Sequence, residues 1–133
     1  MAWQTPKTNW TTSDYFNLNP DYDRISGNIE YLNYLGEKLY GDFPHPTLGE
    51  YTINGWPYAN FLNDIVDSVT ALENYCFKPA ENRPMRTYEA NAPGWSATDL
   101  NIIERNILNL YAAFERQTVA IPKLPIQLGV MQI

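Results

Sequence analysis

The stretch NIIERNILNL, residues 101–110, decides the expected fold because its apolar residues recur at helical spacing. One stripe with steps of three and four residues runs through it and consists of Leu100, Ile103, Ile107, Leu110 and Phe114. Such a stripe occupies one face of an α-helix. Just before it, Ser96 and Asp99 form a pair with the spacing of a capping box. The sequence therefore predicts an amphipathic helix over residues 96–117.

The same pattern occurs twice more, as DRISGNIEYL at residues 23–32 and as NDIVDSVTAL at residues 63–72. All copies have Asp or Asn first, Ile third, Asn or Ser sixth, Ile or Val seventh and Leu tenth. They begin at residues 23, 63 and 101, so the period is 40 and then 38 residues, which is typical of helical repeats and of paired elements in bundles. With Asn19-Pro20 and Pro57 as start signals, further helices are predicted over residues 20–40 and 57–77.

Three amphipathic helices bury their apolar stripes only when the stripes face one another. The predicted fold class is therefore all-α, a three-helix bundle of repeated amphipathic helices with irregular connecting loops. Gly36 lies on the first stripe, where a glycine indicates either a close helix crossing or an early helix end.

The three-helix body is expected over residues 19–117, between two extended arms. Residues 1–18 form the N-terminal arm, with a short helical turn near Thr11 and Asp14. Residues 118–133 form the C-terminal arm, in which Pro122 and Pro125 forbid a helix. An alternating apolar pattern indicates extended chain there: Ile126, Leu128 and Val130. We favour arms that cover neighbouring subunits, and the alternative is that both fold back on their own bundle.

Aromatic and amide residues beside the stripes are the candidate packing and interface residues. A tryptophan precedes each copy, and a fourth opens the arm: Trp10, Trp56, Trp95 and Trp3. We expect the three rings that precede a copy to be packing anchors across the helix starts, and Trp3 to be a packing or interface residue of the arm. Asn28, Ser68 and Asn106 hold the sixth position of each copy, at the border of the core. A polar side chain there can bond an adjacent chain segment or set the helix register.

The charge of the chain argues against two classes of partner. A formal net charge of −6 and a pI near 4.6 repel phosphate backbones and anionic lipids, and the nine Lys and Arg residues are scattered as expected for solvated surface. The apolar stretches fall short of the ~18 residues that cross a bilayer. We therefore expect neither nucleic acid nor a membrane as partner. A single Cys excludes a disulfide framework, and without a recognisable signal segment the expected compartment is the cytosol.

Catalytic, cofactor and metal sites are not predicted. His45, the sole histidine, lies between two prolines with no second His or Cys to complete a metal or nucleophile arrangement. Cys76 falls on the second apolar stripe, where a buried, inert thiol is the favoured interpretation. Asp64, Asp67 and Glu104 are interpreted as solvated carboxylates on exposed helix positions.

A calcium-loop spacing begins at Asn19, with oxygen ligands at Asp21, Asp23 and Glu30. The position that requires glycine in such a loop is Arg24. An acidic N-terminal helix cap is therefore the favoured interpretation of these residues.

Residues 10–14 (WTTSD), the first copy and residues 95–110 resemble a segment of structural proteins from tailed phages and prophages of Gram-positive bacteria. In their tail, baseplate and fibre proteins a Trp, an Asp-Leu-Asn such as Asp99–Asn101, and an Asn-Ile placed before a Leu recur. The opening from Trp3 to Trp10 is similar to the start of such proteins. The resemblance covers about half the chain, and the second copy departs from it at Ser68 and Val69.

The resemblance implies a virion structural protein that is not an enzyme, a tail, baseplate or tail-fibre-associated assembly component acting through protein–protein contacts. Its implied partners are copies of itself and other virion proteins, in the virion and in the host cytoplasm during assembly. The alternatives are a cytoplasmic helical protein-binding module, such as a regulator or inhibitor, and a head–tail neck component. An enzyme with an unfamiliar acidic site is a third class.

Overall fold

The computed structural model describes residues 3–48, 58–87 and 96–120. In this part of the chain a π-helical turn, η1 (Leu18–Tyr22), leads directly into α1 (Asp23–Tyr40), and α2 (Tyr58–Tyr75) and α3 (Ala97–Ala120) follow. The described residues include no strand, and the helices pack against one another. The predicted all-α, three-helix bundle is confirmed.

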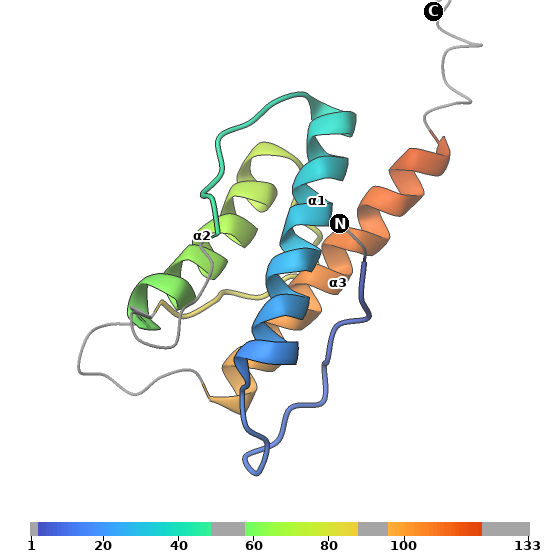
Figure 1. Cartoon of the computed structure of the whole chain (residues 1–133). Coiled ribbons are helices and arrows are strands. Elements are labelled where there is room, and N and C mark those ends of the chain that lie inside the picture. Colours follow the sequence, from blue (N-terminus) through green and yellow to red (C-terminus); the bar gives the residue numbers. More distant parts are fainter. Residues whose placement is uncertain (1–2, 49–57, 88–95, 121–133) are drawn as a thin grey trace, which may run out of the picture.

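All three helices point in the same direction (Figure 1). Arg24, early in α1, contacts Glu104, early in α3, and Tyr40 at the end of α1 donates a hydrogen bond to Gln117 near the end of α3. Each connection must therefore return along the whole bundle. A helix of 18 residues is about 27 Å long, so each return needs at least about eight extended residues. A period near 40 residues accommodates one helix and one return segment.

The core lies along α1, which packs on both α2 and α3, whereas α2 and α3 contact each other less. Eleven residues of the three predicted stripes have at most 1% of their surface exposed: Ile25, Ile29, Leu32, Leu62, Ile65, Val69, Leu72, Ile103, Ile107, Leu110 and Phe114. The helical spacing therefore identified the buried face of every helix correctly.

The first helix ends at Tyr40 as predicted, and the other helix ends differ from the predicted ones by one to three residues. At α3 the Ser96 N–H donates to Asp99 Oδ2 (3.0 Å) and the Asp99 N–H to Ser96 Oγ (3.2 Å), which confirms the capping box. The first helical segment begins at Leu18 rather than residue 20, because the Asn17 carbonyl accepts from Asp21 N–H and the Asp21 carboxylate accepts from Asn17 N–H. The end of α3 is Ala120, three residues beyond the predicted residue 117.

Gly36 marks a close helix crossing. A Cβ atom at this position would lie 2.9 Å from Cys76 Sγ and 3.2 Å from Phe43 Cε1. Because α1 continues to Tyr40, the alternative of an early helix end is wrong. The glycine allows the end of α1 to approach the chain just beyond α2.

The two glycines of α1 provide a matched pair of substitutions. Gly27→Ala should raise the free energy of unfolding by about 0.5–1 kcal/mol, because nothing lies within 4 Å of the new methyl group and alanine favours the helix. Gly36→Ala should lower it by about 1–3 kcal/mol through overpacking. Urea unfolding measures both changes, and adding Cys76→Ala should relieve part of the second. Equal effects at the two positions would contradict the close crossing.

Candidate functional site: a buried charge cluster and amide clamps

The N-terminal arm lies on the bundle, along α1 and α3 (Figure 1). Trp3 stacks on Tyr111 of α3, with ring centroids 3.9 Å apart and planes 7° from parallel. Trp10 is 5% exposed and packs near Phe16. For this arm, folding back on its own bundle is therefore the correct interpretation. Trp10 packs near the start of α3 as predicted, whereas Trp3 packs on the second half of that helix.

The other two tryptophans and the alternating apolar residues of the C-terminal arm lie outside the described residues. These are Trp56, Trp95, Ile126, Leu128 and Val130.

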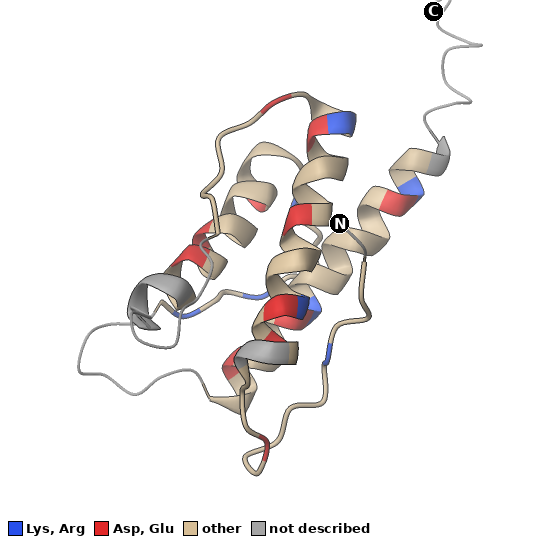
Figure 2. Ribbon diagram, viewed as in Figure 1, with Lys and Arg blue, Asp and Glu red and all other residues tan. Residues whose placement is uncertain are grey.

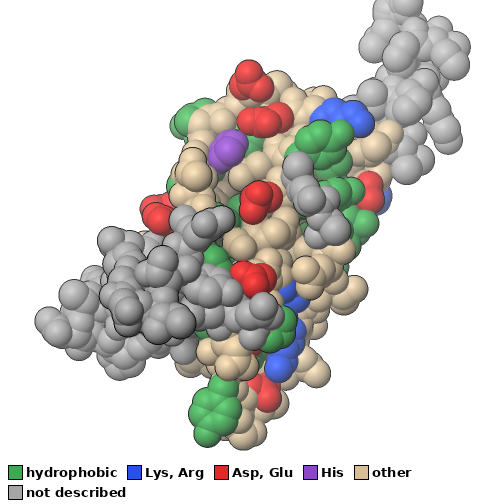
Figure 3. Space-filling model, in the orientation of Figure 1, with side chains coloured by type: hydrophobic (Ala, Val, Ile, Leu, Met, Phe, Trp, Pro, Cys, Tyr) green, Lys and Arg blue, Asp and Glu red, His purple; other side chains and the backbone are tan. Residues whose placement is uncertain are grey.

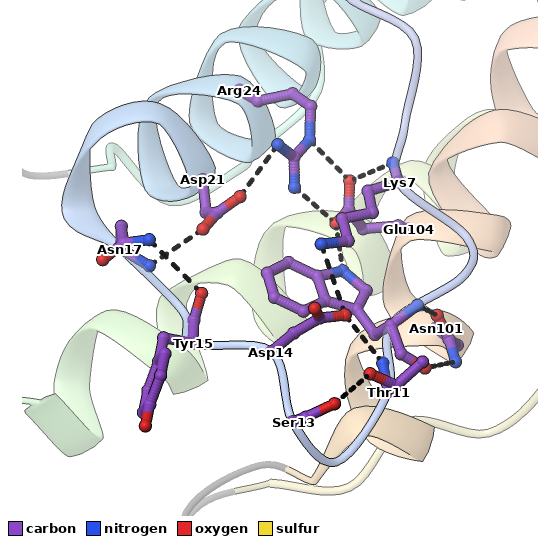
Figure 4. Close-up of polar contacts among 11 residues, drawn as sticks. Lys7, Thr11, Ser13, Asp14, Tyr15, Asn17, Asp21, Arg24, Asn101 and Glu104 are labelled. Atoms are coloured by element: carbon purple, nitrogen blue, oxygen red, sulfur yellow. Dashed lines mark hydrogen bonds and ion pairs between the residues drawn. The ribbon is translucent and has the colours of Figure 1, made fainter.

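Glu104 of α3 is the centre of a buried charge cluster, which we define as Asp21, Arg24 and Glu104 (Figure 4). Its carboxylate is 1% exposed and accepts from Arg24 twice, from Nε at 2.9 Å and from Nη2 at 2.7 Å. It also accepts from the Trp10 ring N–H (2.6 Å) and from the main-chain N–H of Lys7 (2.9 Å). Four donors from α1 and the arm therefore converge on one side chain.

Arg24 is held by two carboxylates. Besides its paired bonds to Glu104, its Nη1 donates to Asp21 Oδ1 at 3.0 Å. Burial disfavours the guanidinium charge, but the bonds to Glu104 and Asp21 outweigh this, so the pKa of Arg24 lies above its ordinary value. Forked arginine–carboxylate bonds are strong and directional, and they fix the orientation of both partners.

The cluster corrects two predictions from the sequence. Glu104 and Arg24 were both interpreted as solvated surface, and both are buried, with 1% and 9% of their surface exposed. The physical reason is the N-terminal arm, whose Lys7 and Trp10 bond to Glu104 and cover this side of α3. A buried ion pair carries a desolvation penalty, which here is offset because every bond to the carboxylate comes from a fixed donor.

Three asparagine side chains, which we call the amide clamps, hold extended chain against the helices. Asn28 accepts from Gln4 N–H and donates to Gln4 C=O, both at 2.8 Å. Asn101 makes the same pair of bonds to the main chain of Trp10, at 2.7 and 3.1 Å. Asn106 makes it to Arg83, at 3.0 and 2.8 Å. Each amide thus gives one residue of extended chain the pair of bonds that a neighbouring β-strand would supply.

The predicted role of Asn28 and Asn106 in bonding an adjacent segment is confirmed. They occupy the same position of the first and third copies, and they hold residues 24 and 23 positions earlier in the chain. The second copy has Ser68 there, and its buried hydroxyl has no hydrogen-bond partner in the described part of the chain. A hydroxyl has a single donor hydrogen and cannot reproduce the geometry of an amide, so the clamp is missing from α2.

His45 and the acidic side chains of α2 lie apart from this cluster. His45 Nδ1 is 3.3 Å from Asn33 Nδ2, and its Nε2 is 3.3 Å from Glu37 Oε2, so the ring is held against α1. Asp67 is exposed, as predicted, whereas Asp64 is half-buried, and burial together with Asp67 raises the pKa of Asp64. Burial, with Asp64 nearby, raises the pKa of Tyr22 to about 12.

Cys76 is half-buried rather than fully buried, against Gly36. Burial, followed by the charge of Glu37, raises the pKa of its thiol to about 11. Because the thiolate is the reactive form, alkylation by iodoacetamide at pH 8 should be about 100-fold slower than for a thiol of ordinary pKa near 9. Mass spectrometry of a labelling time course measures the rate, with protein unfolded in urea as the control. Equal rates in folded and unfolded protein would contradict the inert thiol.

Among residues 3–48, 58–87 and 96–120, three or more His, Cys, Asp or Glu side chains do not come together as a metal site would require. No helix in the same ranges combines the length and the apolar character needed to cross a bilayer. Comparisons with models of protein families, with curated proteins and with solved structures find no match for this chain.

Proposed function

We propose that this chain is a structural protein of a phage virion, a tail, baseplate or tail-fibre-associated assembly component that acts through protein–protein contacts and is not an enzyme. The observation that carries the proposal is the use of its polar motif residues. Glu104 and the amide clamps bind the chain's own arm and loop, and Arg24 joins α1 to α3. The motif that resembles phage structural proteins therefore builds a scaffold.

A cluster of exposed aromatic side chains offers a contact surface for neighbouring subunits. Tyr40 at the end of α1 is 41% exposed, and Tyr75 and Phe77 at the end of α2 are 56% and 42% exposed. Tyr75 stacks with Phe43 at 6.3 Å between ring centroids. Figure 3 shows hydrophobic side chains open to solvent on the face in view. Tyrosine and phenylalanine are enriched at protein interfaces, where a few aromatic residues supply most of the binding energy.

Mass spectrometry of purified particles from the host tests the proposal. We expect the chain at a fixed copy number per particle, and labelling with an antibody should place it in the tail or baseplate by electron microscopy. Its absence from particles would overturn the proposal. Under this proposal the partners of the chain are copies of itself and other virion proteins, which it meets in the virion and, during assembly, in the host cytoplasm.

The exposed aromatic side chains Tyr40, Tyr75 and Phe77 also support the second candidate function, a helical module that holds one partner protein in the cytoplasm. A pull-down separates the two functions. A single stoichiometric partner without particle association would favour the module, and localisation at the head–tail junction would assign the chain to the neck.

A further inference from the structure

A hollow of about 160 Å³ lies on the outer side of α3 and is lined by Arg83, Thr98, Asn101, Ile102, Arg105 and Asn106. Two of the amide clamps border it. Asn101 holds Trp10 of the arm, and Asn106 holds Arg83 of the segment before α3. The walls of the hollow therefore come from segments that are fixed in place by paired hydrogen bonds.

The hollow contains two arginines that have no ion pair in the described part of the chain. Arg83 and Arg105 are both exposed, and neither guanidinium bonds a carboxylate there, whereas Arg24 and Arg86 are both paired. Lys38, Lys78 and Arg116 likewise have no ion pair in the described residues, but Arg83 and Arg105 line the same hollow. The main chain of Arg83 is held by Asn106, so its guanidinium extends from a fixed backbone.

The lining predicts the chemistry of the ligand. Two guanidinium groups can bind a carboxylate through forked hydrogen bonds, and the Thr98 hydroxyl can add another. Ile102, which is half-buried, offers an apolar contact for a short aliphatic stem. A carboxylate on a two-carbon stem is the side chain of glutamate.

The outer face of α1 presents this chemistry. Asp23, Glu30 and Glu37 are exposed at intervals of seven residues. Figure 2 colours acidic residues at intervals along the α1 ribbon, and Figure 3 shows acidic side chains on the face in view. Glu30 has no ion pair in the described part of the chain. One turn further, Tyr34 is 47% exposed and can pack beside the contact. Glu30 is therefore an exposed carboxylate without an ion pair in the described residues, one helical turn from the exposed ring of Tyr34. Aromatic residues are enriched among those that dominate binding energy at interfaces.

We propose that the hollow of one copy binds Glu30 of a second copy. The proposal rests on the function proposed above, because it supplies one contact through which copies assemble. The two surfaces are different, so the contact is heterologous and can propagate into a ring or filament. Charge complementarity selects the orientation, since Arg83 and Arg105 face α1 of the neighbour.

Analytical ultracentrifugation of the purified full chain tests the contact at low and high salt. The native protein should self-associate at low salt and dissociate as salt screens the charges. Arg105→Ala and Glu30→Ala should each weaken association about tenfold or more. The matched controls Arg116→Ala and Glu81→Ala change exposed charges elsewhere and should associate like the native protein.

Mixing the two weakened variants gives a sharper result. Arg105→Ala keeps Glu30, and Glu30→Ala keeps the hollow, so an equimolar mixture should form dimers and no larger species. A native protein that stays monomeric at low salt, or an Arg105→Ala variant that associates normally, would overturn this contact. Detection of the chain in particles would still support the virion function, so the two failures are distinguishable.

Discussion

Replacing Glu104 by glutamine is expected to lower the free energy of unfolding by about 3 kcal/mol, because Arg24 then keeps its charge with only Asp21 as an anionic partner. The new amide NH2 group also faces donors of Arg24 or Trp10, which leaves a buried hydrogen bond unmade. Urea unfolding followed by circular dichroism measures the loss.

Hydrogen exchange locates the effect of Glu104→Gln. The amide of Lys7, which donates to Glu104, should lose protection more than amides of α2. Glu81→Gln is the matched control, since Glu81 is exposed and its change should stay within about 0.5 kcal/mol. A similar stability for both variants would mean that the cluster does not stabilise the fold.

Removal of an amide clamp should have the second largest effect. Asn106→Ala leaves the N–H and C=O of Arg83 without their partners and should cost about 2–3 kcal/mol. Asn106→Asp keeps an acceptor for the N–H but loses the donor and introduces a buried charge, so it should cost at least as much. Asn74→Ala on the exposed side of α2 is the control.

The same clamp variants distinguish anchoring of the loop from a simple packing role. Exchange at the Arg83 amide should accelerate in both Asn106 variants, even where global stability is compensated by a stabilising substitution such as Gly27→Ala. An Asp variant as stable as the native protein would contradict the paired bonds.

The hydrophobic pattern was sufficient to predict the three helices and their buried faces. Residues such as Ile25, Val69 and Ile107 repeat at steps that only a helix places on one side, and each is at most 1% exposed. Amide side chains at the sixth position of two copies also indicated two of the three clamps, because a polar residue at the border of a core needs a partner. The third, Asn101, was not predicted.

The charge cluster could not be predicted, because Arg24 and Glu104 are 80 residues apart and no spacing rule pairs them. One signal was present in the repeat. The fourth position of the pattern is Ser26, Val66 and Glu104 in the three copies. Val66 is apolar, which indicated that the fourth position faces the interior, and in the structure Val66 is 4% exposed. The N-terminal arm completes the burial, and where an arm packs depends on tertiary contacts.

The number of residues between successive helices allows them to point in the same direction but does not require it. Short loops force neighbouring helices to be antiparallel, whereas the stretches at 41–57 and 76–96 are long enough for either direction.

That shared direction gives the body an electrical polarity. In an antiparallel bundle the peptide dipoles of neighbouring helices cancel, but here they add, with about half an elementary charge per helix, positive where the helices start and negative where they end. Asp21, Asp23 and Asp99 lie in the first turns at the positive end and compensate it. Because the positive ends of the three helices lie on one side, these carboxylates compensate one shared field, and each stabilises the body more than it would in an antiparallel bundle.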